Sequence, residues 1–75
     1  DDPAQIHLKS MYEKREDLKK QVRLLKVKKG RETDRAAQRA IDIEIEALIL
    51  EINNLTYKIE HLKYRYPHLS NSTKN

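Results

Sequence analysis

Apolar side chains recur along this chain at alternating steps of four and three residues, in two segments that meet near residue 30. Because an α-helix completes a turn every ~3.6 residues, this spacing places the apolar side chains on one helix face. Asp2 and Pro3 open the first segment, and both residue types are typical of a helix N-terminus. We therefore predict a helix over residues 3–29. Arg15 interrupts its apolar stripe, which consists of Ala4, Leu8, Met11, Leu18, Val22 and Leu25.

The second segment predicts a longer helix over residues 34–66, with Thr33 or Asp34 as its N-terminal cap. Pro67 ends this helix, because the residue before a proline is pushed out of the helical region. We expect the polar tail, residues 67–75, to be disordered. The main stripe alternates isoleucine with leucine over most of its length and consists of Gln38, Ile41, Ile45, Leu48, Ile52, Leu55, Ile59, Leu62, Tyr66 and Leu69.

A second stripe follows the same helix on the nearly opposite face. A helix with one neighbour needs only one apolar face, so a helix with two stripes is expected to have neighbours on both sides. The alanines of this stripe would allow a neighbouring helix to approach closely. Its members are Ala36, Ala40, Ile43, Ala47, Leu50, Asn54, Tyr57, His61 and Tyr64.

Gly30 is the only glycine, and the stripes on its two sides are out of phase. This combination indicates a helix stop in the left-handed conformation and a turn over residues 30–33. We predict an all-α fold, a two-helix antiparallel coiled-coil hairpin that dimerises into a four-helix arrangement. A turn centred near residues 31–32 would place Arg15 opposite Leu48, between Glu44 and Glu51. Leu62, Tyr66 and Leu69 would then lack a partner in the same chain.

Charge separates the two halves of the chain. The net charge is +4, but the first helix is strongly basic and the second mildly acidic, which favours their pairing. With 75 residues the chain is at most one domain, which we expect to be a fragment of a larger protein. The lack of cysteine suggests an intracellular setting, in cytoplasm or nucleus. We expect no membrane span, cofactor, metal site or enzymatic activity, because no run or motif indicates one.

The function that this pattern favours is a non-enzymatic module for protein–protein interaction and oligomerisation, acting as a scaffold. The expected partner is a second copy or another helical protein. The predicted interface combines the main stripe, the second stripe and the tyrosines, because aromatic anchors are enriched at interfaces. Its residues are Ile45, Leu48, Ile52, Leu55, Ile59, Leu62, Ile43, Leu50, Tyr57, Tyr64 and Tyr66.

A basic cluster at the expected hairpin tip offers a second interpretation, a helical hairpin that binds nucleic acid. Such lysines can contact phosphates, although no aromatic residue is interleaved with them to stack on bases. The alternative is that these cations only offset the negative end of the helix dipole. The cluster consists of Lys26, Lys28, Lys29 and Arg31.

The run from Val22 to Gly30, VRLLKVKKG, resembles the end of the first helix in HR1 domains. The stretch from Leu48 to Leu62 is similar in pattern. The resemblance implies an antiparallel coiled-coil finger that binds a Rho-family small GTPase, as a third possible function. Arg31 stands where that family usually has an alanine, and the spacing to the second helix is short.

Overall fold

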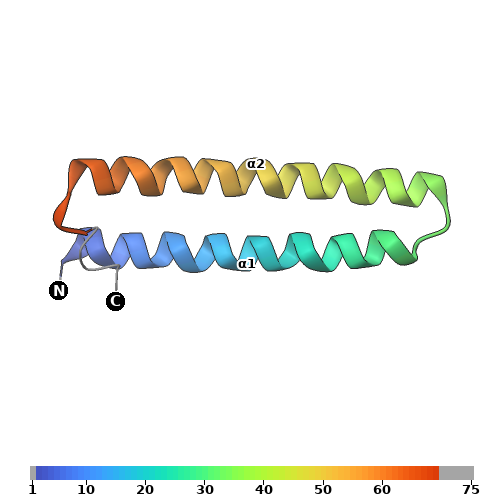
Figure 1. Ribbon diagram of the computed structural model, residues 1–75, viewed down its shortest axis with the longest axis horizontal. Coiled ribbons are helices and arrows are strands. Elements are labelled where there is room, and N and C mark those ends of the chain that lie inside the picture. Colours follow the sequence, from blue (N-terminus) through green and yellow to red (C-terminus); the bar gives the residue numbers. More distant parts are fainter. Residues whose placement is uncertain (1, 70–75) are drawn as a thin grey trace.

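The computed structural model describes residues 2–69, which form two helices joined by a short turn. Helix α1 spans Pro3–Arg31 and helix α2 spans Arg35–Arg65. The helices lie side by side and run in opposite directions, so that both ends of the described chain lie at the same end of the hairpin (Figure 1). The molecule is a rod of 49 × 19 × 16 Å. The all-helical hairpin predicted from the apolar spacing is therefore confirmed.

The first helix begins and ends at identifiable polar groups. The Asp2 carboxylate accepts a hydrogen bond from the Ala4 N–H at 3.0 Å, and Pro3 occupies the first helical position, where its missing N–H costs nothing. Lys28, Lys29 and Arg31 fill the last turn, where cations offset the negative helix end.

Gly30 does not end α1. The helix continues through Gly30 to Arg31, and no described residue, glycine included, has a positive φ. The predicted left-handed stop and the turn over residues 30–33 are therefore wrong. The helix ends instead where Glu32 adopts an extended backbone, with φ −81° and ψ 131°.

The turn itself comprises Glu32, Thr33 and Asp34, and side chains hold it together. The Gln38 amide donates to the Glu32 carbonyl at 2.6 Å, and the Glu32 carboxylate accepts from the Asp34 N–H at 3.1 Å. Asp34 then caps α2 by accepting from the Ala37 N–H at 3.0 Å. These bonds satisfy backbone groups that helix ends leave without intrahelical partners.

The core is one apolar seam between the helices, as the two main stripes predict. Near the turn Val22 packs in a cluster with Ile41 and Ile45. Leu48 and Ile52 pack against this cluster and also against a larger one toward the open end. The larger cluster consists of Leu8, Met11, Leu18, Leu55, Ile59 and Leu69.

The pairing of the helices differs from the expectation at Arg15. Its guanidinium donates to the Thr56 hydroxyl at 3.1 Å, well beyond Leu48 along α2, while Glu51 lies 3.9 Å from Lys14 instead. The difference has two causes. The turn is centred on Thr33 because α1 runs two residues longer than predicted, and side chains on a helix lean toward its N-terminus.

The chain folds back beyond α2 and closes the open end of the hairpin (Figure 1). After Pro67 the Leu69 N–H donates to the Tyr66 carbonyl at 3.0 Å, and the Leu69 side chain is fully buried in the larger cluster. The expectation that Leu62 and Leu69 lack intrachain partners is therefore wrong, as is disorder from residue 67 through Leu69. The rest of the predicted disordered tail, residues 70–75, lies outside the described residues.

Candidate interaction surface

Every member of the second stripe is exposed on α2. We call this surface the outer stripe and define it as the nine residues from Ala36 to Tyr64 named above. Its large members are the most exposed apolar and aromatic side chains on this helix: Ile43 at 62%, Leu50 at 67%, Tyr57 at 74% and Tyr64 at 86%. These four are spaced seven residues apart, so they form one line along the helix.

The main-stripe part of the predicted interface has a different position. Ile45, Leu55 and Ile59 are buried in the seam, and three more of those residues pack against it while partly buried: Leu48, Ile52 and Leu62. In this hairpin α1 already covers these six side chains, so a partner could reach them only if the hairpin opened. The structure thus brings the predicted interface residues to two opposite faces rather than to one surface.

Tyr66 belongs to neither face, because it lies at the C-terminal cap of α2. Its ring meets the His68 ring edge-on, with 6.2 Å between ring centroids. Arg65 lies 6.0 Å from the same ring. Tyr66 is 38% exposed and helps to form the returning turn. Its described contacts are with neighbouring residues of this turn.

Toward the open end, the outer stripe borders α1. Tyr57 and His61 line a shallow groove together with His7 and Met11 of α1. Lys58 and Leu62 complete this groove. A helix lying on the outer stripe would therefore meet apolar surface beyond α2 itself at this end of the hairpin.

The predicted basic cluster is divided between two sides of α1. Lys26 and Lys29 line one groove with Gln38 and Asp42, and the Lys29 ammonium pairs with the Asp42 carboxylate at 2.7 Å. Lys28 and Arg31 lie on another side. The four cations thus do not form a single patch.

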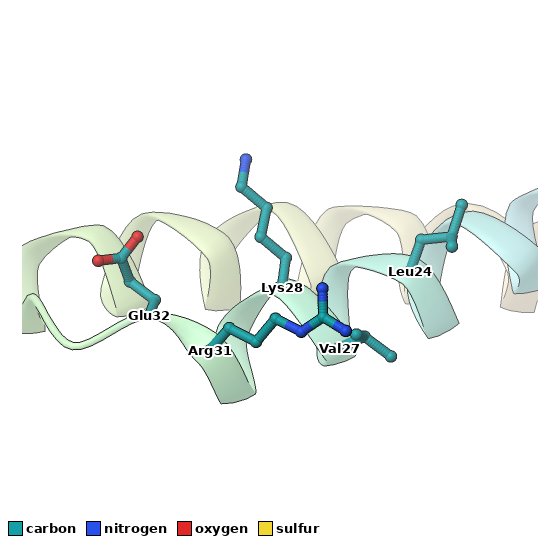
Figure 2. A pocket seen from close by; sticks show the side chains of 5 residues that line it. All are labelled: Leu24, Val27, Lys28, Arg31 and Glu32. Atoms are coloured by element: carbon teal, nitrogen blue, oxygen red, sulfur yellow. The ribbon is translucent and has the colours of Figure 1, made fainter.

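Lys28 and Arg31 border a small apolar patch near the turn. Figure 2 shows the Arg31 side chain running along α1 until its guanidinium lies beside Val27, with Lys28 extending away from it. Leu24 and Glu32 complete this pocket. Leu24 is 60% and Val27 54% exposed. The patch has only these two apolar side chains and is much shorter than the outer stripe.

Arg15 is the one polar interruption of the α1 stripe, and its environment is unusual. Its guanidinium carbon lies 5.1 Å from the centroid of the Tyr12 ring, and the Tyr12 hydroxyl accepts from Lys63 at 3.3 Å. The Arg15 Nε is buried and has no hydrogen-bond partner among the described residues. The sequence predicted carboxylates around this charge, whereas the structure supplies a hydroxyl and an aromatic face.

Asp2 and His68 tie the two ends of the described chain together. Their side chains approach to 2.9 Å between the His68 Nε2 and an Asp2 carboxylate oxygen. The hydrogen bond from His68, together with that from the Ala4 N–H, lowers the pKa of the Asp2 carboxyl below its ordinary value. Sequence reasoning missed this contact, although Pro67 signals the turn that creates it.

Within residues 2–69 no three side chains of His, Asp or Glu are grouped so that they could hold a metal ion. No helix in that range is long and apolar enough to cross a bilayer. No family model, curated protein or solved structure matches the chain, so the HR1-like run does not assign a family.

Proposed function

We propose that this chain is a non-enzymatic helical-hairpin module for protein–protein interaction, whose outer stripe docks a helix of its partner in an assembly. The observation that supports it is the exposure of an entire 4–3 apolar repeat on α2. A repeat of this kind, sustained over more than three heptads, is typical of a helix that packs along another helix. Surface apolar residues without a partner are normally scattered singly.

The difference between the apolar surfaces of the two helices supports the same proposal. Helix α1 buries one stripe against α2, and its exposed large apolar residues, Ile6, Leu24 and Val27, do not continue a repeat. Helix α2 buries one stripe and exposes another. A hairpin of this size also has a small core, and docking adds burial that such small folds need.

The two alternatives from the sequence have less support. A phosphate backbone would need the basic cluster as one surface, but those cations lie on different sides of α1 and Lys29 is paired with Asp42. The small-GTPase alternative depends on one short run of residues, and no geometry of the described chain favours it.

A photo-crosslinking experiment tests the proposal. Tyr57 is replaced by a photoreactive phenylalanine analogue, which keeps the aromatic ring, and the matched control carries the analogue at the exposed Leu24 of α1. We expect position 57 to give a discrete adduct, with the purified chain or in a cell extract. Excess unmodified chain should compete for that adduct, whereas the Leu50→Glu variant should not. Equal adducts from both positions, or none from position 57, would contradict the proposal.

A further inference from the structure

We infer that the helix that docks on the outer stripe is α2 of a second copy of this chain, running antiparallel, with the two-fold axis at the level of Ile52. This inference rests on the proposed function and names its partner. The outer stripe lies on the face of α2 nearly opposite the seam and borders α1 only toward the open end, so two hairpins can meet without displacing α1. The four helices would then lie in the order α1, α2, α2 and α1. Twofold symmetry of this kind is the most common in soluble oligomers.

Side-chain size in the outer stripe alternates in a way that suits antiparallel pairing. Read as heptads, the a positions are small or polar, and the d positions from Ile43 onward carry the large side chains, Ala36 being the exception. Reversing one helix brings each a position opposite a d position, so two layers combine alanine with tyrosine and two combine a polar residue with an aliphatic one. The predicted layers are Ala40 with Tyr64, Ala47 with Tyr57, Asn54 with Leu50, and His61 with Ile43.

A parallel, in-register pair would mismatch the same side chains. Each a position would then face its own copy, so Ala40 would meet Ala40 and leave unfilled space. Each d position would also face its own copy, so Tyr57 would crowd Tyr57. Voids and overpacking both cost stability in a packed interface.

Charges on the first flank of the outer stripe match the same arrangement. This flank carries, in chain order, Glu44, Glu51, Lys58 and Arg65, and all four are exposed. Its acids precede its bases, so reversing one copy brings Glu44 near Arg65 and Glu51 near Lys58 of the second copy. Because these positions flank the contact line, their charges set the orientation and register of the helices.

The second flank is less well matched than the first. It carries the exposed residues Arg39, Glu46, Asn53 and Glu60. Because side chains lean toward the N-terminus of their own helix, the same register brings Glu46 near Glu60 of the second copy and Asn53 near its own copy. The charge argument for the register therefore rests on the first flank.

The other arrangements bring like charges together. A slip of one heptad toward the C-terminal end places Lys58 near its own copy. The opposite slip places Glu51 near its own copy, and the parallel pair places Glu46 near Glu51. Like charges across a contact suppress wrong arrangements, so the first flank favours one register.

Disulfide trapping tests the register directly, because the natural chain has no cysteine. We expect the double variant Ala40→Cys/Tyr64→Cys to form a covalent dimer on oxidation, since disulfides need Cα atoms within about 7 Å. The two positions lie roughly 36 Å apart on their own helix, so they cannot bridge within one chain. The single variant Ala40→Cys should stay uncross-linked, and Ala47→Cys/Tyr64→Cys, which matches the slipped register, should also remain monomeric on denaturing gels.

A charge swap tests the same register without a covalent bond. The variant Glu44→Lys should weaken dimerisation about tenfold, because the pair with Arg65 occurs twice in a symmetric dimer. Adding Arg65→Glu to Glu44→Lys should restore the dimer affinity. Sedimentation equilibrium of the purified chain at high micromolar concentration gives the dissociation constants. Failure of the second substitution to restore the affinity would overturn the proposed register.

The remaining outcomes separate this inference from the proposed function. A purified chain that stays monomeric at high micromolar concentration overturns the inference. If position 57 then still gives an adduct in extract, the proposed function stands, and the partner is a helix of another protein. Cross-linking of Ala40→Cys with itself overturns the antiparallel order in favour of a parallel one. A dimer that resists Leu50→Glu but dissociates with Val27→Glu overturns both the inference and the proposed function.

Discussion

The two faces of α2 carry the same 4–3 spacing but have opposite environments. On the inner face Ile41, Ile45 and Ile59 are buried against α1, whereas on the outer face Leu50 and Tyr57 are mostly exposed. The inner face is aliphatic at nearly every position, but the outer face alternates small with large residues. Identical periodicity therefore supports intrachain packing on one side and leaves an exposed apolar stripe on the other, where we propose that a partner docks.

Truncating one residue on each face of α2 should give the largest difference in the free energy of unfolding. Ile59→Ala should lower the free energy of unfolding by about 3 kcal/mol, because Ile59 is fully buried in the seam. Leu50→Ala, on the outer face, should change it by less than about 0.5 kcal/mol in dilute protein. Urea unfolding followed by circular dichroism at low micromolar concentration measures both. Equal losses would mean that the outer face is part of the folded core.

Leu69 extends the inner face beyond the end of α2. Leu69→Ala should lower the free energy of unfolding by about 2 kcal/mol, because the side chain is fully buried beside Leu8. The matched control is Leu24→Ala, which removes the same atoms from a side chain that is 60% exposed. The same urea titrations compare the two variants. If Leu69→Ala behaves like the control, the returning turn does not close the hairpin in solution.

Arg15 is the polar position of the inner face, and its replacement should stabilise the hairpin. Arg15→Met keeps an unbranched side chain as far as the position of Nε and removes the guanidinium, including a buried Nε without a described hydrogen-bond partner. We expect a gain of about 1 kcal/mol, because the desolvation cost of that group disappears. Thermal unfolding measures it. A loss of similar size would show that the bond to Thr56 and the contact with Tyr12 outweigh the cost.

Gly30 lies near the end of α1. Its predicted left-handed conformation and its observed helical conformation imply opposite effects of an alanine substitution on stability. Gly30→Ala should raise the free energy of unfolding by about 0.5–1 kcal/mol, because the glycine is helical and, beyond its own stretch of helix, an added Cβ would meet no atom within 4 Å. A left-handed glycine would instead make the alanine variant less stable. The sign of the change in melting temperature separates the two conformations.

The smallest effect concerns the link between Asp2 and His68 at the open end. Because folding lowers the pKa of Asp2 from its ordinary value of 3.8, its contribution is present above that pH and is lost as the pH falls through the lower folded value. Asp2→Asn should therefore melt slightly below the natural chain at pH 6, and the difference should vanish once the pH falls below the lowered folded pKa of Asp2. In a His68→Gln background the difference at pH 6 should shrink. A difference that persists at low pH would exclude a charge effect.

Local patterns predicted most of the fold. The 4–3 spacing located both helices to within two residues, and the stripe from Leu8 to Val22 is the buried face of α1. Asp2 and Asp34 cap the helices because their short carboxylates reach nearby N–H groups, which requires no distant residue. The existence of the outer stripe was equally visible, since its spacing is a property of α2 alone.

The errors arose where a residue's role depends on distant parts of the chain. Gly30 was assigned a stop from local preference, but the helix ends at Glu32, where Gln38 from the next helix holds the turn. Leu69 was assigned to a disordered tail because its neighbours are polar, yet the open end of the seam offers it a buried position. Propensity is a weak prior that such contacts override.

The sequence by itself determined the helices, their caps and the two apolar stripes of α2, because periodicity and capping act within a few residues along the chain. Only the tertiary structure decided what surrounds Arg15, where Leu69 packs, and how the basic residues from Lys26 to Arg31 divide between two sides. Those outcomes depend on the register of two helices that are joined only at the turn. A shift in the position of that turn changes every contact across the seam while leaving the local pattern unaltered.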